Sequence, residues 1–134
     1  MNSKLLMWLP ILVATLLLAS CEENEVPIPT SDAPRVSILS PAASDSAFAS
    51  GDPILIQVQF DDDDELHEML VTVIRLHDGA MVFQQHLHQH GSHYRWINTL
   101  NLNTTIESEF EVRAIVTDHE LQRSTDTVVF TLLP

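Results

Sequence analysis

The chain of 134 residues is long enough for one folded domain with a single hydrophobic core. It has 6 lysines and arginines against 19 aspartates and glutamates, and the formal net charge of −13 argues against nucleic acid and anionic lipid headgroups as ligands, because both require basic patches. The same charge balance is compatible with divalent metals and cationic partners.

Residues 1–20 have the composition of a signal peptide. A short basic start at Lys4 precedes an apolar run, residues 5–18, which is too short for a comfortable membrane span. The sequence Leu-Ala-Ser-Cys that ends at Cys21 resembles the cleavage box of bacterial lipoprotein precursors. That resemblance implies cleavage before Cys21, the only cysteine, and a lipid anchor on its sulfur that holds the protein to the membrane. The alternative is an ordinary secretory signal with an incidental cysteine.

Residues 21–32 are acidic and then proline-rich, which indicates an extended tether after the lipidated cysteine. The acidic start resembles the surface-export signals of Bacteroidota lipoproteins, and the alternative is a solvated linker. We therefore expect an outer-membrane lipoprotein of the cell envelope that faces either the periplasm or the cell surface.

Residues 33–134 alternate apolar and polar positions in short segments separated by turn residues, which predicts β-strands. Asp78-Gly79 is the strongest hairpin signal and predicts a two-residue turn. We find no sustained helical periodicity. The expected strands cover Arg35–Ser40, Ile54–Phe60, Met69–His77, Ala80–His90, Tyr94–Leu102, Phe110–Thr117 and Thr125–Leu133.

These seven strands predict an all-β fold, a seven-stranded antiparallel Ig-like β-sandwich. The segments V-S-I-L-S-P (36–41), F-A-S-G-D-P-I-L-I-Q-V-Q-F-D (48–61), E-L-H-E-M-L-V-T-V (65–73) and E-V-R-A-I-V-T-D-H-E-L (111–121) carry a resemblance. They are similar to the Ig-like and fibronectin-III-like modules of Bacteroidota lipoproteins, among them a small His-bearing family of unknown function. The Cys-Trp-Cys pattern of antibody domains is missing.

The expected topology gathers histidines at one pole of the sandwich. The loop after residue 60, the end of strand 80–90 and the loop after residue 117 all lie at the same end of such a fold. This pole should contain His67, His90, His93 and His119 together with Asp61, Asp62, Asp63, Asp64, Glu65, Asp118 and Glu120. His77, beside the predicted hairpin turn, belongs to the opposite pole.

Period-two alternation places Phe83 and Leu87 on one face of strand 80–90 and His86, His88 and His90 on the other. Alternate residues of a strand, about 7 Å apart, can chelate one metal ion, as in zinc enzymes. Tyr94 and Trp96 alternate with Arg95, and we expect them to fill the core.

The predicted two-residue turn also fixes a register between strands 69–77 and 80–90. That register pairs His90 with His67, His88 with Met69 and His86 with Val71. A β-bulge would shift each pair by one residue without changing the face on which the histidines lie.

Imidazole suits Zn(II), Cu(II) and Ni(II), whereas the oxygens of Asp61–Asp64 suit Ca(II). We prefer zinc or copper to calcium, because the aspartate run lacks the spacing of a dedicated calcium loop. The alternatives are a polar strand edge that discourages edge-to-edge pairing and a solvated acidic loop. The proposed metal ligands are His67, His86, His88, His90, His93 and His119.

A modification site is also predicted in the loop that follows the first strand. Asp45-Ser46-Ala47 resembles the D-S-A type O-glycosylation motif of Bacteroidota, with Ser46 as the acceptor. A tripeptide this short also occurs by chance.

The motifs do not indicate an enzyme. There is no G-x-S-x-G motif and no phosphate-binding glycine loop, and a small sandwich offers little pocket, so no catalytic residue is expected. Two functions remain. One is a non-catalytic binding or structural module that contacts a protein or glycan at the cell envelope. The other is a lipoprotein that captures zinc or copper at its histidine pole.

Overall fold

The computed structural model describes residues 28–45 and 47–134. The predicted signal peptide, the lipidation site Cys21, the first part of the tether and the predicted glycosylation site Ser46 lie outside the described residues. No helix in the described ranges is long and apolar enough to span a membrane.

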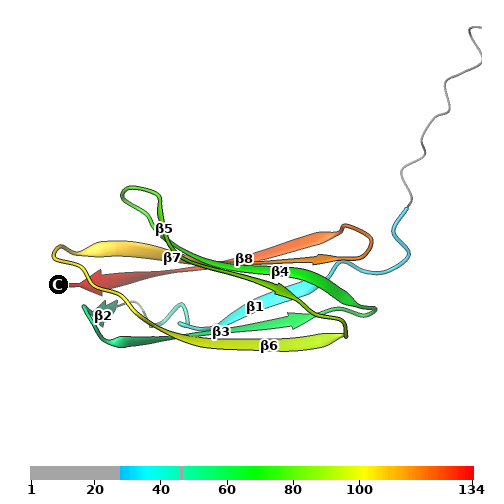
Figure 1. The fold of residues 1–134 in the computed structure, drawn as a ribbon, viewed down its shortest axis with the longest axis horizontal. Coiled ribbons are helices and arrows are strands. Elements are labelled where there is room, and N and C mark those ends of the chain that lie inside the picture. Colours follow the sequence, from blue (N-terminus) through cyan, green and yellow to red (C-terminus); the bar gives the residue numbers. More distant parts are fainter. Residues whose placement is uncertain (1–27, 46) are drawn as a thin grey trace, which may run out of the picture.

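Eight β-strands form two sheets that pack face to face (Figure 1). One sheet has the order β1-β3-β6 and the other the order β2-β8-β7-β4-β5. The predicted all-β sandwich is confirmed, but the structure has eight strands rather than seven. The strands are β1 (Arg35–Ser40), β2 (Ala47–Ala49), β3 (Pro53–Asp61), β4 (Leu66–Arg75), β5 (Ala80–His88), β6 (His93–Asn101), β7 (Ser108–Asp118) and β8 (Arg123–Leu133).

The strand that the sequence did not predict is β2. It runs parallel to β8, with Ala47 opposite Thr131, whereas the other strand pairs are antiparallel. The Phe48 ring packs edge-on against the ring of Phe130 at a centroid distance of 5.5 Å, which fixes β2 to the core. Three residues are too few to show a period-two pattern, so the strand was not visible in the sequence.

The core lies between the inner faces of the two sheets. In β3, alternate residues from Ile54 to Phe60 are fully buried, which reproduces the predicted alternation. Trp96 is buried and Tyr94 packs against the core, as predicted. Phe83 and Leu87 of β5 also pack against the core, so the predicted division of β5 into an apolar and a histidine face is confirmed.

Asp126 of β8 links the two sheets at an open edge. Its Oδ2 accepts a hydrogen bond from the backbone N–H of Ile38 in β1 at 2.7 Å. We expect Asp126→Ala to lower the free energy of unfolding by about 1–3 kcal/mol, because the mutation leaves a partly buried donor without its charged acceptor. Urea unfolding measures this loss. Asp126→Asn, which keeps an acceptor oxygen, should retain most of the stability, and equal losses in both variants would contradict this role.

The β4–β5 hairpin departs from the predicted register. β4 ends at Arg75, opposite Ala80, so the turn consists of residues 76–79 rather than Asp78-Gly79 alone. Val82 is then an extra residue on β5, which shifts the register by one. The predicted pairs His90–His67, His88–Met69 and His86–Val71 are therefore wrong. Instead, His88 lies opposite Glu68 and His86 opposite Leu70.

The turn between β4 and β5 is closed by an ion pair. The Arg75 guanidinium donates to both carboxylate oxygens of Asp78, at 3.1 and 2.6 Å, and the backbone N–H of Ala80 donates to Oδ1. These hydrogen bonds lower the pKa of Asp78 from 3.8 to about 2, and the bond from Arg75 has the largest effect.

The lowered pKa predicts an acid-side contribution of Asp78 to folding. A depressed carboxyl pKa stabilises the fold above the unfolded value of 3.8, and this contribution is lost as the pH falls towards about 2. An NMR titration of the Asp78 carboxyl carbon should have its midpoint near the lower value. Arg75→Gln should move the midpoint back towards 3.8, and an unchanged midpoint in this variant would contradict the assigned cause.

Candidate metal centre

Loops from three strand connections meet at one end of the sandwich, the end at which the chain enters β1 (Figure 1). Backbone hydrogen bonds hold the β5–β6 loop against the corner between β3 and β4. Leu66 N–H donates to the Gly91 carbonyl at 3.0 Å, and Asp62 N–H donates to the Ser92 carbonyl at 2.9 Å. Gly91 has a φ of 142°, which side-chain-bearing residues rarely adopt, so glycine permits the turn that follows His90.

A β-bulge at the start of β4 aims His67 at this surface. Leu66 pairs with Asp118 and Glu68 pairs with Thr117, so His67 is an extra residue between two consecutive pairs with β7. Leu66 points into the core, whereas Glu68 is exposed on the outer face. Because a bulge redirects the side chain of the inserted residue, His67 joins Glu68 and His88 rather than the core.

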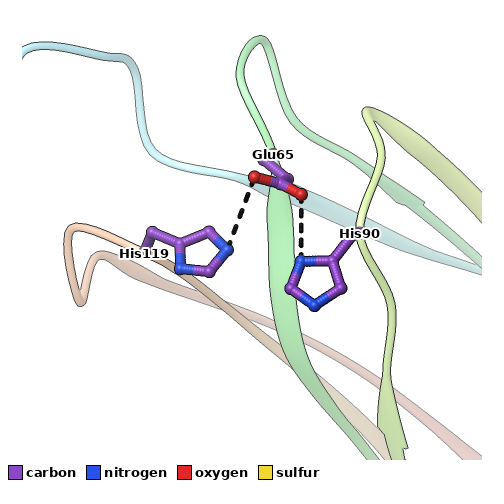
Figure 2. A group of neighbouring side chains, drawn as sticks. All are labelled: Glu65, His90 and His119. Carbon is purple, nitrogen blue, oxygen red and sulfur yellow. Dashed lines mark hydrogen bonds and ion pairs between the residues drawn. The ribbon is translucent and has the colours of Figure 1, made fainter.

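Figure 2 shows Glu65 between His90 and His119. Oε1 of Glu65 lies 2.9 Å from Nδ1 of His90, and Oε2 lies 3.6 Å from Nε2 of His119. These residues come from the β3–β4, β5–β6 and β7–β8 connections, which are far apart in sequence. We call Glu65, His90 and His119 the first triad; one ligand atom from each lies within 4.8 Å of the other two.

His67, Glu68 and His88 form a second triad with the same spacing limit of 4.8 Å. The two triads are in contact. His88 Nε2 and His90 Nε2 are 3.0 Å apart, and the rings of His67 and His119 have centroids 4.2 Å apart. We refer to the six residues of both triads as the histidine cluster.

The hydrogen bond that His90 donates to Glu65 orients the ring of His90. A carboxylate only accepts hydrogen bonds, so His90 donates through Nδ1 and its Nε2 is left without a proton in the neutral ring. Metal-binding histidines commonly have this arrangement, in which the second ring nitrogen donates to a carboxylate. The cluster is open to solvent, since the side chains of His90 and His119 are 56% and 43% exposed.

Two of the predicted ligands lie outside both triads. His93 starts β6 in the other sheet, where its Nδ1 contacts Asp61 Oδ1 at 2.7 Å. His86 is on the same outer face as His88, but it lies along a shallow pocket with Leu70 and Arg123. His77 is at the opposite end of the domain, next to Asp78, as predicted. The structure thus unites four of the six predicted histidines.

Apart from Glu65, the acidic residues predicted at this pole do not face a common site, because most of them contact partners of their own. Asp61 accepts from Gln59 as well as His93, Asp63 pairs with Arg35, and buried Asp62 accepts from the backbone N–H of Asp64. Asp118 is buried, and its carboxylate is bound by Gln122. Neither triad contains a residue of Asp61–Asp64. The oxygen-rich calcium site considered from the sequence therefore has no counterpart in the two triads.

Glu120, next to His119, binds the entering chain instead of facing the cluster. Its carboxylate accepts hydrogen bonds from the backbone N–H and hydroxyl groups of Thr30 and Ser31, at 2.7–3.2 Å. These hydrogen bonds lower the pKa of Glu120, and the bond from the Thr30 hydroxyl has the largest effect. The chain therefore enters the domain beside the histidine cluster.

Sequence reasoning placed Glu65 at the pole but not among the ligands, and it missed Glu68. In a regular strand, Glu68 and His67 point to opposite faces, so the E-L-H-E sequence of residues 65–68 does not show that they converge. The bulge between Leu66 and Glu68 brings them together.

No protein-family model matches the chain, and no curated protein matches it. Spo0M, a sporulation control protein from Bacillus subtilis, superposes with a TM-score of 0.54 at 11% identity, over 77% of this chain and 50% of that chain. A Niemann-Pick type C2 protein from the Japanese carpenter ant has a TM-score of 0.44 at 10% identity, over 76% of this chain and 92% of that chain. The chain spans half the length of the Spo0M structure, and at this identity the likeness shows the fold alone.

Proposed function

We propose that this protein is a non-catalytic binding module of the cell envelope, anchored through Cys21, whose ligand is a divalent transition metal. One observation carries the proposal. Four histidines from the start of β4, the end of β5, the β5–β6 loop and the β7–β8 turn meet on one surface patch, with neighbouring ring centroids 4.2–6.4 Å apart. A merely solvated strand face does not explain this convergence, because alternation along one strand accounts for His88 and His90 but not for His67 and His119, which come from distant segments.

The donor set favours zinc and copper. Imidazole nitrogens with one or two carboxylates suit Zn(II), Cu(II) and Ni(II), whereas Ca(II) takes six to eight oxygens. Two nitrogens bound to one tetrahedral zinc at about 2.0–2.1 Å are about 3.3 Å apart. In each triad the ligand atoms lie within 4.8 Å of one another, so rotations of the side chains bring them to that spacing.

The position of the cluster supports a role in capturing or buffering metal. His90 and His119 are about half exposed, so an ion reaches them without opening of the core. The net charge of −13 attracts cations to the surface. In this proposal the domain presents the metal to the envelope compartment or passes it to a protein partner, and it performs no chemistry on it.

Calorimetric titration with Zn(II) and Cu(II) tests the proposal. The full-length protein, purified in mild detergent, should bind with micromolar or higher affinity. A variant in which alanine replaces His67, His88, His90 and His119 should lose this binding. The matched control replaces His77, His86 and His93 and should bind like the unaltered protein. Millimolar affinity, or equal affinity in all three proteins, would refute the proposal.

Glu65→Gln should weaken zinc binding by at least about 10-fold, because it removes the carboxylate of the first triad, and loss of a merely orienting carboxylate already costs about 10–100-fold. The amide occupies the same volume but no longer supplies a charged acceptor for Nδ1 of His90. The same titration measures the change. Glu107→Gln, at an exposed glutamate near the opposite pole, is the control and should leave the affinity unchanged.

A further inference from the structure

The histidine cluster divides into two sets of ligands that have no residue in common. The first triad is Glu65, His90 and His119, and the second is His67, Glu68 and His88. Each contains two imidazoles and one carboxylate, a combination that holds zinc or iron in many metal sites and leaves further coordination positions open. From this division we propose that the pole binds two transition-metal ions side by side, one in each triad. The inference rests on the proposed metal-binding function.

The spacing within each triad fits one ion. Two ligands that are each about 2.0–2.2 Å from the same ion are at most about 4.4 Å apart. Ligand atoms of each triad already lie within 4.8 Å of one another, so side-chain rotations that move these atoms by about an ångström close either set around an ion. A single tetrahedral ion would use four of the six ligands and leave two without a metal.

Contacts between the triads place the two ions close together. His88 of the second triad and His90 of the first approach through their Nε2 atoms at 3.0 Å. Metal pairs about 3.5–4 Å apart are common in proteins that hold two ions. Each triad brings its own carboxylate, Glu65 or Glu68, which offsets part of the repulsion between two dications. The second ion is therefore expected to bind more weakly than the first.

His67 supplies an independent observation for the second triad. Its Nδ1 is buried, and no hydrogen-bond partner for this atom exists among the described residues. A buried polar atom without a partner costs free energy, and a missing ion is one of its recognised explanations. The bulge between Leu66 and Glu68 brings this ring to the face that carries Glu68, whereas in a regular strand the two side chains would point to opposite faces.

Counting the bound ions tests the inference. Native mass spectrometry of the full-length protein, released from detergent after incubation with Zn(II), should give two zinc ions per chain. The double variant Glu65→Gln with His119→Ala should bind one zinc ion per chain. A second double variant, Glu68→Gln with His67→Ala, should also bind one. His86→Ala with His93→Ala should leave two. If His67→Ala impairs folding, the single variant Glu68→Gln replaces the second double variant, because Glu68 is exposed and does not contribute to the core. In calorimetry this single variant should weaken one of the two zinc-binding steps.

The outcomes separate the two proposals. One zinc ion in the unaltered protein, lost entirely in either double variant, would mean a single shared site and would overturn the two-ion inference while the proposed metal-binding function stands. No zinc in the unaltered protein would overturn both. A spin–spin interaction between two Cu(II) ions in the fully loaded protein, absent from each double variant, would support two adjacent ions.

Discussion

Replacement of both His88 and His90 by alanine is expected to weaken Zn(II) binding by more than about 100-fold, since loss of a merely orienting partner already costs about 10–100-fold. These two histidines join the triads through the 3.0 Å contact of their Nε2 atoms, so the double variant removes one ligand from each triad. Both side chains are exposed, and folding should not change. Calorimetric titration measures the affinity, and circular dichroism verifies the fold.

The matched control for this variant is His86→Ala with His93→Ala. His86 is on the same strand face as His88, and His93 follows His90 closely in sequence, yet neither belongs to a triad. The control should retain the affinity of the unaltered protein. Equal losses in the two variants would mean that histidine content, rather than the geometry of the cluster, determines binding.

Phe130→Ala should lower the free energy of unfolding by about 3–5 kcal/mol, the usual cost of removing a large buried aromatic ring. Phe130 is 1% exposed and stacks on Phe110 at 5.6 Å between ring centroids, while Phe48 meets it edge-on. Its loss therefore leaves a cavity in the core beside Phe110 and removes the ring against which Phe48 of β2 packs. Urea unfolding followed by tryptophan fluorescence measures the change, with Trp96 as a buried reporter.

Val129→Ala is the control for this prediction, because Val129 is the preceding residue on the same strand and is 44% exposed on the outer face. Its cost should stay within about 0.5 kcal/mol. Similar losses at both positions would contradict the burial pattern of β8 and, with it, the orientation of this strand in the sandwich.

The fold and the histidine pole were predictable because both follow from alternation and topology. Strict alternation in residues 54–60 identifies a half-buried strand whatever the details of its turns. Sandwich connectivity then brings the β3–β4, β5–β6 and β7–β8 connections to one end, which unites His67, His90 and His119 without any knowledge of contacts. The separation of the β5 histidines from Phe83 and Leu87 also survived the shift in register.

Bulges account for most of what the sequence did not predict. Val82 and His67 are each inserted into an otherwise regular strand pair, and nothing in their side chains distinguishes them from neighbouring positions. The first insertion changes which residues face His86 and His88. The second turns His67 outward beside Glu68, so the composition of the second triad depends on one irregular residue.

The acidic residues illustrate the difference between proximity and convergence. Asp61 and Asp63 do lie near the predicted pole, but each finds its own cationic or donor partner, His93 or Arg35. Glu120 is next to His119 in sequence and is nevertheless engaged by the entering chain. Strand ends place residues at a pole, whereas the local turn decides which side chains point towards one another. Because the β-sandwich fold hosts many functions, the function must be argued from these side chains.

The most direct test of the proposed metal centre is side-chain NMR of the seven histidines during titration with Zn(II). The ring-nitrogen resonances of His67, His88, His90 and His119 should shift with the first equivalents of zinc, and those of His77, His86 and His93 should keep their positions. Shifts confined to the latter three, or no shift at any histidine until zinc is in large excess, would contradict the account.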